Sequence, residues 1–78
     1  MARVRFFAQA RDATGCREAD IDGATLGEVI DAAVARFGPR LDEVVKISRI
    51  WVNGEPAELD KRLASDDEVA VLPPVSGG

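Results

Sequence analysis

The sequence predicts an α+β fold, in which one main helix covers one face of a mixed β-sheet of about four to five strands. Three observations predict this fold. Several short segments alternate apolar and polar side chains, which is the period of a half-buried strand. One segment, residues 26–37, instead repeats apolar residues at helical spacing. The last strand-like segment runs into a proline pair and then a glycine pair, so an extended, flexible tail should follow the folded part.

The first two strands are expected as a hairpin at the N-terminus. Residues 3–8 and 16–21 both alternate apolar and polar side chains, with Ala8 as the last inward-facing residue of the first segment. Residues 9–14 between them are polar, and Gly15 marks the turn into the second strand. The pattern therefore predicts two strands joined by a rather long loop.

The next segment carries both a start signal and a stop signal for a helix. Thr25, followed three residues later by Glu28, has the form of a capping box, so the helix should begin at Leu26. The apolar residues fall on a single stripe that consists of Leu26, Val29, Ile30, Ala33, Val34 and Phe37. Gly38 can supply a left-handed cap, and Pro39 prevents the helix from continuing. We expect about three turns of helix packed on the sheet.

A second hairpin is expected after the helix. Residues 48–52 have the pattern of a third strand, and Asn53 with Gly54 is a strong hairpin turn signal. A short fourth strand should follow at residues 55–59. It contains Pro56, which has no N–H to donate to a neighbouring strand, so this strand should lie at an edge of the sheet.

The last strand is expected at residues 68–72, whereas residues 41–47 give no clear signal and are expected to be irregular. The resulting order is strand, strand, helix, strand, short strand, strand. This order, followed by a glycine-pair tail, is that of the β-grasp or ubiquitin-like fold. We therefore divide the chain into a β-grasp domain at residues 1–72 and an extended tail at residues 73–78.

The composition excludes several classes of function. The chain has 78 residues, a net charge of −4, no histidine and one cysteine, Cys16. A single cysteine without histidine can form neither an intramolecular disulfide, nor a Cys/His metal site, nor a nucleophile–histidine pair. Cys16 is best explained as a small packing residue. The basic residues form no continuous stripe, so we expect no nucleic acid partner.

The N-terminal residues 1–8 lead directly into strand-like sequence, without the apolar core of a signal peptide. No apolar run in the chain is long enough to span a bilayer. We therefore expect a cytoplasmic chain without a membrane partner.

The tail is the chemically distinctive part of the sequence. Its reactive group is the α-carboxylate of Gly78, which is ionised at neutral pH and is a weak electrophile until another protein activates it. Gly77 lacks a Cβ atom, so it can enter a narrow cleft. The residues that would enter a partner's active site together with Gly78 are Gly77, Ser76, Val75, Pro74 and Pro73. The chain has no phosphate-binding loop of the G-x-x-x-x-G-K-[ST] type, so any ATP must be bound and consumed by a partner, and we expect no bound cofactor and no metal.

Two segments resemble the MoaD family, the small sulfur-carrier subunits of molybdopterin synthase, and more broadly the MoaD/ThiS group of ubiquitin-like proteins. They are residues 71–78, with the sequence VLPPVSGG, and residues 10–15, with the sequence ARDATG. The family ordinarily has a glycine between acidic residues just before the last strand, where this chain has Ser65, Asp66 and Asp67. This departure changes a turn and leaves the chemistry of the tail untouched.

The resemblance implies that the chain is a non-catalytic sulfur-donor subunit. In this scheme an adenylating enzyme of the MoeB or ubiquitin-activating type forms an acyl-adenylate at Gly78, and a sulfur donor converts it to a thiocarboxylate. Two such carriers would assemble with a dimer of the large, MoaE-like synthase subunit as a 2:2 heterotetramer. Each tail would donate sulfur to a pterin precursor in molybdenum cofactor biosynthesis. No general acid or base is required of the carrier itself.

Four residues are candidates for contact with such partners. Alternation places Phe7, Trp51 and Leu72 on the sheet face away from the helix, where they can form an apolar docking patch. Leu72 is the strongest of the three because it adjoins the tail. Arg11, in one of the family-like segments, can pair with an acidic group on the adenylating enzyme.

Three other functions are compatible with the sequence. The same chemistry can deliver sulfur to thiamine, to cysteine or to a tungsten cofactor, because the carboxylate mechanism does not depend on the acceptor. Alternatively, the chain is a ubiquitin-like protein modifier whose Gly78 becomes amide-linked to lysines of target proteins. A plain interaction module with an idle tail is the least favoured, since the terminal motif adds site chemistry to the fold.

Overall fold

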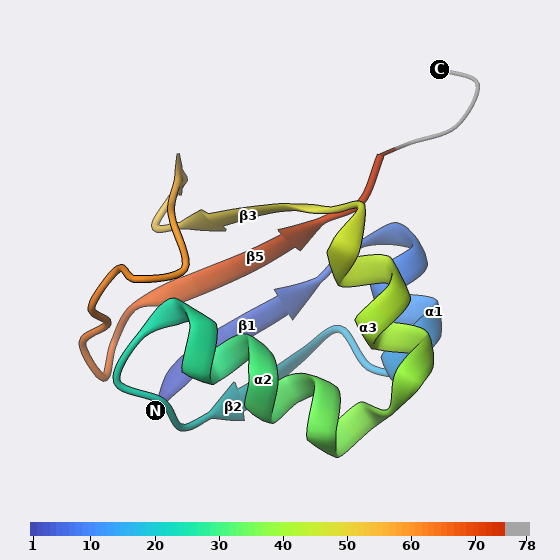
Figure 1. Cartoon of the computed structure of the whole chain (residues 1–78), viewed down its shortest axis with the longest axis horizontal. Coiled ribbons are helices and arrows are strands. Elements are labelled where there is room, and N and C mark those ends of the chain that lie inside the picture. The colour runs from blue at the N-terminus through green and yellow to red at the C-terminus, as the bar shows by residue number, and fades with distance from the viewer. Residues whose placement is uncertain (75–78) are drawn as a thin grey trace.

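The computed structural model describes residues 1–74, and Val75, Ser76, Gly77 and Gly78 lie outside the described residues. Figure 1 shows the described elements arranged as a sheet with helices packed against it. In chain order the elements are β1 (Ala2–Phe6), α1 (Ala8–Thr14), β2 (Glu18–Ile21), α2 (Leu26–Phe37), α3 (Pro39–Lys46), β3 (Arg49–Val52), β4 (Glu55–Pro56) and β5 (Glu68–Leu72).

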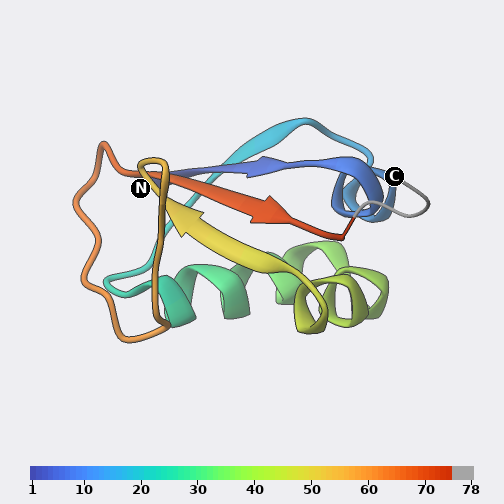
Figure 2. The same cartoon turned by 90° about the horizontal axis from the view of Figure 1, so that it is seen from above.

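The sheet has five strands in the order β2-β1-β5-β3-β4, and its centre is a parallel pair. β1 runs parallel to β5, while the β1–β2, β3–β5 and β3–β4 pairs are antiparallel. Figure 2 shows that α2 and α3 both lie on one face of this sheet. The prediction of a mixed sheet with a main helix on one face, the β-grasp fold, is confirmed.

The core lies between the sheet and the helices. Inward-facing residues of the central strands, such as Val4, Val69 and Val71, have no exposed surface. Phe6 packs edge-on against Phe37 of α2, with ring centroids 5.4 Å apart and an interplanar angle of 78°. Edge-to-face aromatic pairs add stabilisation beyond the apolar area that they bury. This pair therefore ties the end of β1 to the end of α2.

The predicted start of α2 is confirmed. The Thr25 hydroxyl accepts a hydrogen bond from the Glu28 N–H at 3.2 Å, and the Glu28 carboxylate in turn accepts one from the Ala24 N–H at 3.2 Å. At the other end, α2 stops at Gly38 as expected, but Gly38 has φ 98° and ψ −175°, so the predicted left-handed helical cap is wrong. Pro39 then occupies the first turn of α3, where proline is favoured because its missing N–H is not needed.

The predicted loop at residues 9–14 is wrong, because these residues belong to the helix α1. The short helix is held by tertiary contacts rather than by local signals. The Ala10 side chain is completely buried. Gly15 has φ 75°, which is left-handed, and its N–H ends the helix by donating a hydrogen bond to the Arg11 carbonyl. Ala8, expected as the last inward residue of the first strand, instead has φ 48° and starts α1. β1 therefore ends at Phe6.

The segment expected to be irregular, residues 41–47, lies largely in α3. Leu41 has no exposed surface, and this burial against the core explains why so short a helix forms. The fourth strand is also shorter than predicted, because β4 contains only Glu55 and Pro56. Its predicted position at the sheet edge is confirmed, as is the Asn53-Gly54 turn, in which both residues have positive φ.

Asp67 joins the loop before β5 to the turn after β3. Its carboxylate accepts hydrogen bonds from the Ala64 N–H at 2.8 Å and from the Asn53 side-chain amide at 2.9 Å. Both hydrogen bonds lower the pKa of Asp67 below its ordinary value, and the bond from Ala64 has the larger effect. Because the pKa is lower in the folded chain, the stabilisation is present above the unfolded-state pKa and is lost as the pH falls through the folded-state pKa.

We expect Asp67→Asn to lower the melting temperature at neutral pH, because an amide cannot replace both accepted hydrogen bonds. The difference in melting temperature between wild type and Asp67→Asn should narrow as the pH falls from the ordinary aspartate pKa of about 3.9 through the lower pKa of folded Asp67, where its carboxylate becomes protonated. Thermal melts followed by circular dichroism from pH 7 to pH 2.5 measure this gap. Asp66→Asn is the matched control, since the Asp66 side chain makes no hydrogen bond within residues 1–74. A gap for Asp67→Asn that stays constant with pH would contradict the assignment.

Candidate tail-docking site

The structure describes the first two residues of the predicted tail, Pro73 and Pro74. β5 ends at Leu72, and Pro73 is still buried, whereas Pro74 is exposed. The two prolines continue in the chain beyond the last strand, as expected from their missing N–H groups. The other predicted tail residues, from Val75 to Gly78, lie outside the described residues. From Pro74 to Gly78 there are five residues, which can span at most roughly 17 Å when fully extended.

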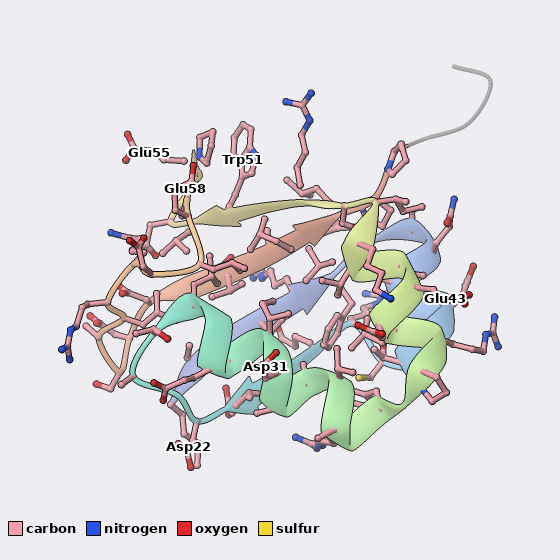
Figure 3. All side chains as sticks on the ribbon, in the orientation of Figure 1. Asp22, Asp31, Glu43, Trp51, Glu55 and Glu58 are labelled. Carbon is pink, nitrogen blue, oxygen red and sulfur yellow. The ribbon has the colours of Figure 1, made fainter. Side chains whose placement is uncertain are left out.

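An apolar patch lies on the sheet face away from α2. The strand registers place Trp51 of β3 between Ala70 of β5 and Pro56 of β4, with Leu72 two residues further along β5. Figure 3 shows the Trp51 ring projecting from β3 away from α2 and α3. Trp51 and Leu72 are half-buried rather than free in solvent. Their predicted position on this face is confirmed, and their role in docking remains a prediction.

Phe7 and Arg11 lie at the end of the sheet from which the tail departs. Phe7 is 42% exposed and is the residue before α1, directly after Phe6, which pairs with Val71 of β5. Arg11 is exposed on α1, and it lines the same cavity as Phe7. The structure therefore brings Phe7, Arg11 and Leu72 to one end of the molecule, while Trp51 lies further along β3.

The remaining part of this sheet face is covered by ion pairs. Arg5 of β1 lies 3.0 Å from the Glu68 carboxylate and 3.6 Å from that of Glu18, and Arg3 lies 3.5 Å from Asp20. These side chains are all about half exposed, so each pair contributes at most about 1 kcal/mol to stability. Their main effect is to neutralise the β1–β2 half of the face. The apolar β3–β5 half is left as the region suited to a protein partner.

Two arginines near the tail were missed by sequence reasoning. Within residues 1–74, neither Arg17 nor Arg49 has an ion pair, and both are exposed. Arg49 pairs with Leu72, the last residue of β5. It is two residues before Trp51 in β3, so alternation alone predicts that the two side chains share a sheet face. Arg17 precedes β2 and lines the cavity that Phe7 and Arg11 share, a position that no local sequence signal indicates.

No helix among residues 1–74 has the length and apolar character needed to cross a membrane. The same part of the chain holds no group of three or more His, Cys, Asp or Glu side chains arranged to bind a metal ion.

Comparisons with known proteins place the chain in a family. The sequence pattern of the ThiS family matches residues 4–78. The chain is 36% identical to small archaeal modifier protein 1 of Haloferax volcanii, over 95% of this chain and 97% of that protein. It is 33% identical to the molybdopterin synthase sulfur carrier subunit of Arabidopsis thaliana, over 97% of this chain and 81% of the plant protein.

Solved structures agree with these sequence relatives. The crystal structure of the Haloferax volcanii modifier superimposes with a TM-score of 0.84, covering 99% of this chain and 98% of the other. A complex of subunits 1 and 2 of the molybdopterin-converting factor from Helicobacter pylori contains a chain that is 27% identical, with a TM-score of 0.71 and coverage of 99% and 97%. The fold, the tail and the relatives together show that this chain belongs to the ThiS family, within the MoaD/ThiS group of ubiquitin-like sulfur carriers.

Proposed function

We propose that this protein is the sulfur carrier of a molybdopterin synthase and that it acts through the carboxylate of Gly78. The observation that carries the proposal is the end of β5, where Leu72 lies in the apolar patch, Pro73 is buried and Pro74 is exposed. In the sequence, these residues are followed by an ending in Gly77 and Gly78. The likeness to the plant sulfur carrier subunit supports the molybdopterin branch of the family.

The first step is activation of the tail by a partner. A carboxylate oxygen of Gly78 attacks the α-phosphorus of ATP, the bond to the β-phosphate breaks, and pyrophosphate leaves. The product is an acyl-adenylate at Gly78. The chain has no loop that could hold the triphosphate, so the adenylating enzyme supplies the ATP site and the catalytic groups.

The second step places sulfur on the tail. A donor at the oxidation level of sulfide attacks the acyl carbon, AMP leaves, and Gly78 becomes a thiocarboxylate. Its sulfur then attacks a carbon of the pterin precursor in the active site of the large synthase subunit, and the bond from that carbon to an oxygen substituent breaks. Water next cleaves the acyl–sulfur bond, so that Gly78 is released as a carboxylate and the sulfur stays on the pterin. Holding the sulfur on a tail that is confined in the cleft raises its effective concentration at the acceptor. The likeness to the Helicobacter pylori complex of two subunits supports a large-subunit partner, which we propose assembles as a 2:2 heterotetramer.

A second function is favoured by one specific observation. The relative from Haloferax volcanii is named a modifier protein, and it is similar to this chain over almost the full length of both proteins. Modification would begin with the same adenylate but would end with an amide bond between Gly78 and a lysine of a target protein. The two functions therefore share the tail and the activation step and differ in the nucleophile that is accepted.

The test of the proposed function is the intact mass of the protein after incubation with ATP, the adenylating enzyme and a sulfide donor. We expect a mass increase equal to the replacement of one oxygen by sulfur, which should be absent when Gly78 is deleted. Adding the large subunit and the pterin precursor should return the carrier to its original mass. If the activated protein instead forms amide bonds to lysines of other proteins and transfers no sulfur, the modifier function replaces the proposed one.

A further inference from the structure

A basic cavity lies beside the end of β5 from which the tail departs. Its volume is about 430 Å³, and it is lined by Arg5, Phe6, Phe7, Arg11, Arg17 and Glu18. Phe6 pairs with Val71 in the parallel register, and its N–H donates to the Arg17 carbonyl at 2.8 Å. The cavity is therefore separated from the last residues of β5 by β1 alone.

The cavity carries positive charge that its surroundings do not neutralise. The Arg5 Nε atom lies 3.0 Å from a carboxylate oxygen of Glu68 and 3.6 Å from one of Glu18. Arg11 and Arg17, by contrast, are exposed and have no ion pair within residues 1–74. Three arginines against Glu18 and against Glu68, which contacts Arg5, leave this region with a charge of +1, in a chain whose net charge is −4. Phe7, which is 42% exposed, supplies an apolar wall, and such a wall strengthens an ion pair formed beside it by excluding water.

The position of the cavity indicates which part of a partner it would meet. When the tail extends into the cleft of the adenylating enzyme, Gly78 lies up to roughly 14 Å beyond Pro74. The arginines at the base of the tail are then too far from the acyl-adenylate to contact its phosphate. They face the rim of the cleft instead. Protein carboxylates are the anionic groups available at such a rim, and guanidinium groups bind them with two parallel hydrogen bonds.

We propose that this cavity receives an acidic side chain from the rim of the tail-binding cleft of the adenylating enzyme, and that Arg11 and Arg17 hold it. The proposal rests on the proposed function, because it requires the tail to enter that enzyme. It does not depend on the sulfur acceptor, since adenylation precedes transfer to any acceptor. Arg11 and Arg17 act as docking residues and do not touch the reacting atoms.

The experiment measures ATP–pyrophosphate exchange by the adenylating enzyme as a function of the concentration of this protein. Arg11→Glu and Arg17→Glu should each raise the KM roughly threefold to tenfold, and the double variant about tenfold to a hundredfold, with kcat changed less than about twofold. Arg62→Glu is the matched control. Arg62 is exposed, has no ion pair within residues 1–74 and lies in the loop before β5, at the opposite end of that strand from the tail. It should leave the KM unchanged.

Salt provides a second readout that a general loss of folding would not reproduce. The wild-type KM should rise with salt between about 50 and 500 mM, whereas that of the double variant should rise much less, because screening acts on the lost ion pairs. Equal KM values for the double variant and Arg62→Glu would overturn the proposal. A lower KM in the double variant would also overturn it, by indicating that the chain's own carboxylate occupies the cavity. Wild-type protein that supports no exchange at all would remove the proposed function and this inference together.

Discussion

Phe6→Ala should remove a large part of the stability of the protein. Phe6 is 2% exposed and packs against Phe37 at 5.4 Å, so the substitution removes a buried ring and leaves a cavity where β1 meets α2. Such changes cost about 3–5 kcal/mol. A domain of 78 residues has a free energy of unfolding of roughly 4–12 kcal/mol, so this loss is a large fraction of it. The melting temperature should fall by more than about 12 °C.

The chain provides its own control in the next residue. Phe7 is 42% exposed, and Phe7→Ala removes the same side chain from the surface rather than from the core. We expect Phe7→Ala to change the free energy of unfolding by less than about 1 kcal/mol. Urea unfolding followed by tryptophan fluorescence, using Trp51, measures both variants. Similar losses for the two would mean that the burial of Phe6 is not what fixes the end of β1.

The comparison of α2 with the other helices shows which features of the fold could be predicted from the sequence. α2 has 12 residues, a side-chain cap at Thr25 and a complete apolar stripe, so its signals are local and redundant. α1 has 7 residues and no side-chain cap, and α3 has 8 residues. Isolated helices of this length are unstable in water, and what stabilises these two is the burial of Ala10 and Leu41. That burial depends on the assembled core, which no local pattern encodes.

The candidate site also has features that could be predicted from the sequence and features that could not. The position of Trp51 on the face away from the helix (Figure 3) and the edge position of Pro56 follow from residue types and alternation, which are properties of the sequence. The burial of Pro73 and the placement of Arg11 and Arg17 around one cavity depend on the assembled fold, which residue types and alternation do not reveal. Arg17 lies outside both family-like segments, so neither its local pattern nor the resemblance indicates it.

One alanine added after Gly78 should abolish adenylation without changing the fold. The added residue moves the carboxylate by about 3.8 Å and places a Cβ atom where the tail otherwise has only glycine. A misplacement of about 1 Å in an active site can cost a hundredfold in rate, so we expect at least about that loss in ATP–pyrophosphate exchange. The mass increase that marks the thiocarboxylate should disappear with it.

The control for this extension is one alanine added before Met1. The N-terminal ammonium group lies 3.8 Å from the exposed Asp22 carboxylate, and Figure 1 shows this terminus at the opposite end of the sheet from the end of β5. The N-terminal addition should therefore leave exchange unchanged. If the C-terminal addition were equally harmless, the carboxylate of Gly78 could not be the reacting group, and both the carrier and the modifier functions would fail. An interaction module, in which the sheet face binds and the tail is idle, is the one function that predicts equal behaviour of the two extended proteins.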